Sequence, residues 1–173
     1  NQLQLHFSDD QAFRIESSSH PEVVSAQHLT KQQVKELVAL AHARHIAIVP
    51  EIDSPGHLGA VLKAHPRLQL RNAQGEPVPG AVDISRPGAA RLVDDLLREF
   101  APLFADGAEP ELGRHWHLGG DEYLALTAED PEASYPRLAR QARREHGKGA
   151  TVRDLATAWL NDRAETGRSL GWT

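Results

Sequence analysis

The sequence predicts an α/β fold in which parallel strands alternate with helices. Three short runs have the residue pattern of strands, at about residues 2–7, 46–52 and 114–118, and a further strand is possible at 169–172. Segments with helical periodicity lie between them. Strands that alternate with helices are joined by right-handed crossovers, in either an open doubly wound sheet or a (β/α)8 barrel. Both architectures bind ligands at the carboxyl ends of the strands.

Acidic residues follow directly after the first two expected strands. The run from Leu3 to Phe7 alternates apolar and polar residues, as a half-buried strand does, and leads into Ser8-Asp9-Asp10. The run from Ile46 to Val49 is apolar and β-branched, and Pro50-Glu51-Ile52-Asp53-Ser54-Pro55-Gly56-His57 follows it. An Asx turn at the first position and a Pro-Gly turn at the second are the structural alternatives to a functional role.

The third expected strand, Arg114 to Leu118, leads into Gly119-Gly120-Asp121-Glu122. Consecutive side chains of a strand point to opposite faces, so neighbouring carboxylates would normally diverge. Glycine tolerates backbone angles that are forbidden to other residues, and the pair can therefore aim Asp121 and Glu122 into one pocket. A solvated turn before a helix is the alternative. Because three acidic clusters follow three strands, the sequence favours a functional site.

Helices are expected between these strands. Thr30-Lys31-Gln32-Gln33 has the form of a capping box, Ser85-Arg86-Pro87 has the form of a helix start, and a third helix begins near Thr151. The segments 71–81 and 127–136 are rich in Gly, Pro and polar residues and are expected to be irregular loops near the mouth of the site.

Composition narrows the class of protein. The chain is 40% hydrophobic and 25% charged, and it contains no apolar run long enough to span a membrane. Its net charge of −5 argues against a nucleic-acid partner. The absence of cysteine excludes disulfides and thiolate metal sites. We expect neither a cofactor nor a metal ion.

Three segments together resemble glycoside hydrolase family 20, which comprises β-N-acetylhexosaminidases and relatives such as lacto-N-biosidases. They are Leu5–Arg14, Val49–His57 and His117–Glu122, and they resemble the second, third and fourth barrel strands of that family. The resemblance implies part of a TIM (β/α)8 barrel, about strands 2 to 5 with their helices, and one partial catalytic domain over residues 1–173. A whole barrel typically needs about 250 residues. We therefore expect a segment of a longer protein, whose unclosed barrel edges could promote oligomer formation. The resemblance to the family also implies a secreted or periplasmic location.

The resemblance also implies a reaction and a set of residues. The family removes β-linked N-acetylhexosamine (GlcNAc or GalNAc) from oligosaccharides and glycoconjugates by a retaining, substrate-assisted mechanism, in which the 2-acetamido oxygen of the sugar forms an oxazolinium intermediate. Glu122 corresponds to the general acid and base, and Asp121 to the residue that orients the acetamido group and stabilises its positive charge. His57, Asp9, Asp53 and His6 are expected to support the pair. Trp172 is expected either to form a wall of the sugar pocket or to be a core tryptophan.

Three alternatives stay open at this stage. The first is release of a disaccharide, as in a lacto-N-biosidase, and the second is a carbohydrate-binding fragment without turnover. The third is a metal-dependent hydrolase, whose ligands would come from His6, Asp9, His57, His117, Asp121 and Glu122. The sequence lacks a ligand spacing as diagnostic as His-Glu-x-x-His, which disfavours the third alternative.

Overall fold

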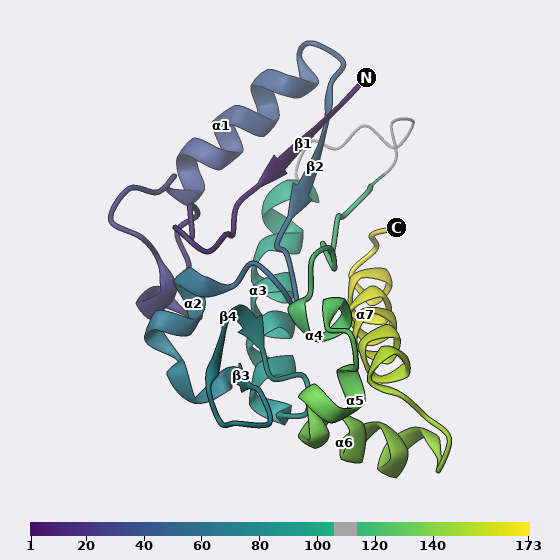
Figure 1. Ribbon diagram of the computed structural model, residues 1–173. Coiled ribbons are helices and arrows are strands. Elements are labelled where there is room, and N and C mark those ends of the chain that lie inside the picture. The colour runs from purple at the N-terminus through teal and green to yellow at the C-terminus, as the bar shows by residue number, and fades with distance from the viewer. Residues whose placement is uncertain (106–113) are drawn as a thin grey trace.

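The computed structural model describes residues 1–105 and 114–173 (Figure 1). Strands are interspersed with helices up to residue 82, and the described elements from residue 87 on are helices. The described elements, in chain order, are β1 (Gln2–His6), η1 (Pro21–Val23), α1 (Lys31–His42), β2 (Ala47–Glu51), α2 (Gly59–Ala64), η2 (Pro66–Leu68), β3 (Gln69–Arg71), β4 (Pro77–Val82), α3 (Pro87–Ala105), α4 (Leu124–Thr127), α5 (Pro131–Ser134), α6 (Pro136–His146) and α7 (Val152–Ser169). Within the described ranges no helix has the length and hydropathy of a membrane span.

The first two predicted strands are confirmed, and they pair in parallel. The register places Gln2 opposite Ala47 and His6 opposite Glu51. Helix α1 forms the crossover between the strands and packs against β2 and against α3 (Figure 1). Because parallel partners run in the same direction, β1 and β2 end at the same edge.

The prediction of a full third strand at 114–118 is wrong, since the structure has a single parallel bridge there, between Glu51 and His117. The amide of His117 donates to the carbonyl oxygen of Pro50 over 3.0 Å. Proline has no amide hydrogen, so Pro50 cannot return a hydrogen bond to the segment that precedes His117. The ladder is therefore cut to one rung, although that rung still brings the segment alongside β2.

The prediction of a strand at 169–172 is also wrong. Helix α7 runs through Ser169, and a Schellman motif ends it: the amide of Gly171 donates to the carbonyl of Arg168, and the amide of Trp172 donates to that of Gly167. Gly171 has φ +84°, the left-handed conformation that this motif requires. Strand-like pairing begins only at Thr173, which exchanges hydrogen bonds with the 114–116 segment.

The predicted helix starts are confirmed. Thr30 and Thr151 each form a complete capping box, with Gln33 and Asp154 respectively, and Pro87 opens α3. Helix α3 packs against α1 on one side and α7 on another. Its buried side includes Ala89, Leu92, Val93, Leu96, Leu97, Phe100, Ala101, Leu103 and Phe104.

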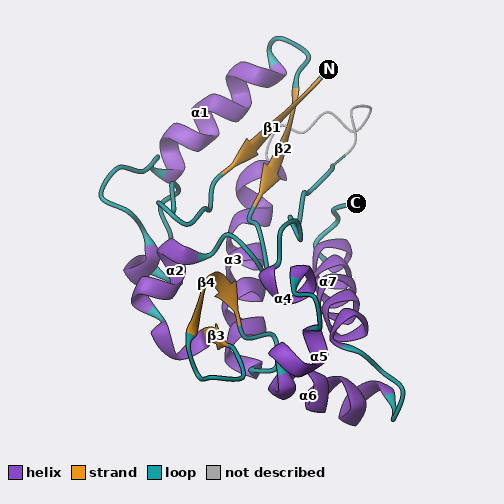
Figure 2. Cartoon of the chain, in the orientation of Figure 1, coloured by secondary structure: helices purple, strands orange, loops and turns teal. Residues whose placement is uncertain are grey.

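The two segments expected to be irregular contain regular structure. Strands β3 and β4 form an antiparallel hairpin that is separate from the β1–β2 pair (Figure 2). Asn72 closes the turn, because its side-chain oxygen accepts from the amides of Gln74 and Glu76. Between 127 and 136, helix α5 forms where Asp130 caps the amide of Ala133. These local hydrogen bonds stabilise a turn and a short helix in segments whose Gly and Pro content alone predicted irregular loops.

Candidate active site

The three acidic clusters meet at the edge where β1 and β2 end. Asp53 lies at the centre and is fully buried. Its amide donates to the hydroxyl of Ser8 over 2.9 Å, which ties the end of β2 to the end of β1. Its Oδ1 accepts from the amide of Gly120 over 2.9 Å, which ties it to the loop after His117. Among the described residues, its buried Oδ2 has no hydrogen-bond partner.

The glycine pair bends the chain around Asp53, in agreement with the conformational freedom expected of it. Gly119 and Gly120 have φ values of +71° and +94°. A Cβ atom on Gly119 would lie only 1.6 Å from Oδ1 of Asp53. The close approach of this loop to the buried carboxylate therefore requires glycine at position 119.

The loop brings Glu122 to His57. Nε2 of His57 lies 3.3 Å from Oε2 of Glu122, and Nδ1 of His57 lies 3.7 Å from Oδ1 of Asp9. Both His57 and Glu122 have positive φ, at +50° and +51°, a conformation that is uncommon for residues other than glycine and often occurs at functional sites. The side chain of Glu122 is 77% exposed, so a substrate can reach it.

Asp121 lies beside the same histidine. A carboxylate oxygen of Asp121 lies within 4.8 Å of ligand atoms of both Asp53 and His57. The structure therefore brings together five of the residues singled out in the sequence, which are Asp9, Asp53, His57, Asp121 and Glu122.

Burial and neighbouring charge shift the protonation of two of these groups. Burial raises the pKa of Asp53 to about 6, and the charge of Asp121 adds to the rise while the hydrogen bond from Gly120 opposes it. Burial by itself would lower the pKa of His57. The negative charges of nearby carboxylates have a larger effect and raise this pKa above its ordinary value; the carboxylates are those of Asp53, Asp10, Asp121 and Asp9. The cluster thus favours a cationic imidazole next to a carboxyl that keeps its proton to unusually high pH.

We expect Asp53→Asn to remove part of the pH dependence of stability. Asp53 has a raised pKa in the folded protein, so the unfolded chain releases this proton first, and wild-type stability falls as pH rises from about 4 to about 6. A shift from 3.8 to about 6 corresponds to about 3 kcal/mol. The unfolding free energy of Asp53→Asn minus that of wild type should therefore increase by about 2–3 kcal/mol between pH 4 and pH 7 in urea titrations.

The exposed Asp162 on α7 supplies the control for this experiment. Asp162→Asn makes the same chemical change away from the cluster, and its stability difference from wild type should be equal at the two pH values. A constant difference for Asp53→Asn as well would contradict the assignment of a raised pKa to the buried carboxyl.

The β3–β4 hairpin forms one wall of the site, which sequence reasoning missed. A cavity of about 160 Å³ lies between the hairpin and the acidic residues, lined by Asp10, Gly56, His57, Pro79, Gly80, Ala81, Glu122 and Leu124. Oδ1 of Asp10 accepts from the amide of Gly59 over 2.9 Å. A Cβ atom on Gly80 would lie 2.3 Å from that same oxygen, so the hairpin backbone packs directly on the carboxylate.

Glu51 is a buried carboxylate that the sequence analysis did not single out. It accepts from Gln4 over 2.7 Å, and its two oxygens lie 2.9 Å from Nδ1 of His6 and 2.8 Å from Nδ1 of His117. Burial alone would raise the pKa of Glu51, but hydrogen bonds from these three partners lower it. A charged residue at the end of an apolar strand was the available signal.

The ligand set of the metal-dependent alternative is divided between two places. His6 and His117 contact Glu51, and Nε2 of His6 lies 4.0 Å from Oδ2 of Asp9. In the part of the chain that the structure describes, the three-residue groups at this site that could hold a metal ion are Asp9-Asp10-His57 and Asp53-His57-Asp121. Neither contains His6, His117 or Glu122, so the six candidate ligands do not form one coordination shell.

Trp172 occupies a position that favours the core alternative. It is 4% exposed and packs edge-to-face against Trp116, with ring centroids 5.4 Å apart. It borders a small cavity that Leu118 and Arg163 also line, distinct from the cavity next to Glu122.

Comparisons with known proteins agree on one family. A model described as "Glycosyl hydrolase family 20, catalytic domain" matches residues 1–170. A lacto-N-biosidase from Bifidobacterium bifidum is 34% identical over 135 residues, which are 78% of this chain and 11% of the relative. A beta-N-acetylhexosaminidase from Cellulomonas fimi is 36% identical over 140 residues, covering 73% of this chain and 27% of the relative.

A solved structure resembles the described fold over the full length of this chain. The Flavobacterium johnsoniae chitobiase superposes with a TM-score of 0.80 and 29% sequence identity, over 100% of this chain and 26% of that protein. This chain therefore spans about a tenth to a quarter of the length of these relatives.

Proposed function

The chain belongs to glycoside hydrolase family 20, and from this we propose that it carries the catalytic pair of an enzyme that removes β-linked N-acetylhexosamine units. The observation that carries the proposal is the meeting of Asp121, Glu122 and His57 at the ends of β1 and β2. We further propose that residues 1–173 are a partial catalytic domain, contributing about strands 2 to 5 of a (β/α)8 barrel with their helices.

Glu122 is the proposed acid and base. Its exposed side chain lines the cavity next to the hairpin, where a glycosidic oxygen can approach it, and its carboxylate lies 3.3 Å from the imidazole of His57. As acid it protonates the leaving oxygen, and as base it then takes a proton from the water that opens the intermediate. His57, whose Nδ1 lies 3.7 Å from Oδ1 of Asp9, keeps the Glu122 carboxyl group in one orientation through both steps.

Asp121 is the proposed partner of the acetamido group. In a substrate-assisted reaction the 2-acetamido oxygen attacks the anomeric carbon, so the group becomes a positively charged oxazolinium. A carboxylate beside the acetamido N–H orients the group for attack and stabilises this charge as it develops. The position of Asp121, next to Glu122 and within 4.8 Å of Asp53 and His57, supports this division of labour.

The proposed substrates are oligosaccharides or glycoconjugates that end in GlcNAc or GalNAc. Release of a disaccharide is the second candidate, because one of the similar relatives is named a lacto-N-biosidase. The test compares three chromogenic substrates with the purified full-length protein: a β-N-acetylglucosaminide, a β-glucoside and a β-lacto-N-bioside. We expect the N-acetylglucosaminide to be cleaved at least about a hundredfold faster than the glucoside, with no loss of activity on exhaustive chelation.

Each other outcome has a distinct meaning. Preference for the lacto-N-bioside would select the disaccharide alternative. Equal cleavage of the glucoside would contradict assistance by the acetamido group. Activity that a chelator abolishes and zinc restores would favour a metal-dependent hydrolase, and tight binding of N-acetylhexosamine without turnover would indicate a carbohydrate-binding fragment.

A further inference from the structure

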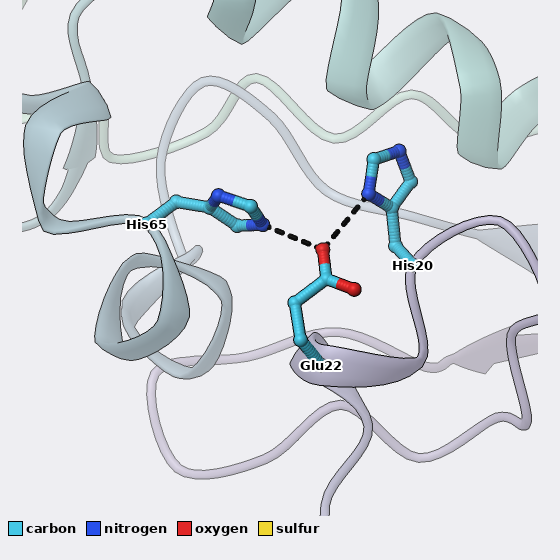
Figure 3. Close-up of side chains that lie close together, drawn as sticks. All are labelled: His20, Glu22 and His65. Carbon is cyan, nitrogen blue, oxygen red and sulfur yellow. Dashed lines mark hydrogen bonds and ion pairs between the residues drawn. The ribbon is translucent and has the colours of Figure 1, made fainter.

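A second cluster of titratable side chains lies away from Asp121 and Glu122. Nδ1 of His20 lies 3.0 Å from Oε1 of Glu22, and Nε2 of His65 lies 2.8 Å from the same oxygen. Figure 3 shows both imidazole rings directed at this single carboxylate oxygen. His20 precedes η1, Glu22 lies within η1, and His65 is the residue that ends α2. The cluster therefore joins two segments that are far apart in the sequence.

The donor set matches that of a zinc site. Imidazole nitrogen and carboxylate oxygen are zinc ligands, and three protein ligands with an open fourth position are a common arrangement. The three donor atoms lie within 4.8 Å of one another. A tetrahedral ion with bonds of about 2.0–2.1 Å separates its ligands by about 3.3 Å. The distances of 3.0 and 2.8 Å from the two imidazole nitrogens to Oε1 of Glu22 need to increase by only a few tenths of an ångström.

His20 also has the outer partner that metal-binding histidines use. Its other ring nitrogen, Nε2, lies 3.5 Å from Oδ2 of Asp95 on α3, and this buried atom has no hydrogen-bond partner in the described ranges. A histidine that binds a metal through one nitrogen usually directs its other N–H to a carboxylate, which fixes the ring and strengthens the ligand. Asp95 is placed for this role.

An ion can reach the cluster from solvent. A surface cavity of about 590 Å³ is lined by His20, His65 and Asp95, together with residues of η2 and α3. It offers an entry path and space for a water molecule as fourth ligand.

We propose that His20, Glu22 and His65 bind a divalent transition-metal ion, with zinc the best match, and that the ion links η1 to the end of α2. Without an ion, the same atoms form a hydrogen-bonded cluster in which both rings donate to Glu22. To bind an ion, each neutral ring moves its proton to its other nitrogen, Nε2 of His20 and Nδ1 of His65, so that Nδ1 of His20 and Nε2 of His65 present lone pairs to the metal. The metal bridge is then stronger than two partly exposed hydrogen bonds. The site is separate from Asp121 and Glu122, so its expected effect is on stability.

The test is zinc titration of the purified full-length protein, stripped of metal, by calorimetry and by thermal unfolding. We expect a single zinc equivalent per chain and a rise in Tm on the order of 5 °C at a hundredfold excess over the dissociation constant. His65→Gln and Glu22→Gln should each weaken zinc binding by about tenfold to a hundredfold and reduce the Tm shift accordingly. Cobalt(II) should give the visible absorption of a four-coordinate site in wild type and lose it in both variants.

Two control variants separate this site from others. His28→Gln removes an exposed histidine of the segment that follows η1, and His57→Gln removes the histidine shared by the two acidic groups near Glu122. Both should keep one zinc equivalent with unchanged affinity. Wild type that binds no zinc, or variants at His65 and Glu22 that are folded by circular dichroism and bind as wild type does, would overturn the proposal. Either result leaves the proposed glycosidase function untouched.

Discussion

Glu122→Gln is expected to lower kcat/KM by about 10²–10⁴-fold on substrates with poor leaving groups, because glutamine cannot deliver a proton to the leaving oxygen. The substitution keeps the size and shape of the side chain, and the carboxyl is largely exposed, so neither the fold nor KM should change much. Substrates with an activated aryl leaving group need little protonation and should lose less. The measurement is a comparison of both substrate classes in wild type and variant.

Glu129→Gln is the matched control, since Glu129 is an exposed residue a short distance along the same segment. It should leave both substrates unaffected. If Glu122→Gln also stayed within a few-fold of wild type on the poor leaving group, Glu122 would not be the acid. A loss that was equal for both leaving groups would instead indicate a role in binding or in positioning.

Much of the fold and of the site could be predicted from the sequence where local signals agree with the tertiary structure. The capping residues Thr30 and Thr151 determine helix starts by local hydrogen bonds, and such starts form wherever the sequence has the pattern. The acidic clusters could be placed at one edge because parallel strands end together. The contacts of His57 with Asp9 and with Glu122 agree with the expected arrangement.

The parts that could not be predicted depend on contacts between distant residues or on the loss of a donor. The segment 114–118 has the composition of a strand, but Pro50 on the neighbouring strand removes the hydrogen bond that would extend it. Glu51 gathers His6 and His117 from two different segments, which no local spacing reveals. The contact between the β3–β4 hairpin and the site likewise joins distant residues, Gly80 and Asp10, and no local pattern in the sequence indicates it.

Asp121→Asn is expected to lower kcat/KM by about 10²–10³-fold on N-acetylhexosaminides, comparable to the loss of one group that stabilises developing charge. Asparagine keeps a hydrogen-bond acceptor for the acetamido N–H, but it lacks the negative charge that opposes the oxazolinium. Asp121 is exposed, so the variant should fold as wild type does. The preference for N-acetylglucosaminide over glucoside should shrink by the same factor, because the lost interaction acts only through the acetamido group.

The double variant Asp121→Asn, Glu122→Gln makes this prediction sharper. Substitutions of two groups that serve one chemical step have strongly non-additive effects. The factor by which the double variant lowers kcat/KM should therefore be far smaller than the product of the two single factors. Asp162→Asn, which changes an exposed residue on α7, serves as the control. Its effect on kcat/KM and that of Glu122→Gln should be independent, so the factor for this double variant should equal the product of the two single factors. An Asp121→Asn variant that kept full preference for the acetamido sugar would show that the charge of Asp121 does not act on this group, and the role proposed for Asp121 would be wrong.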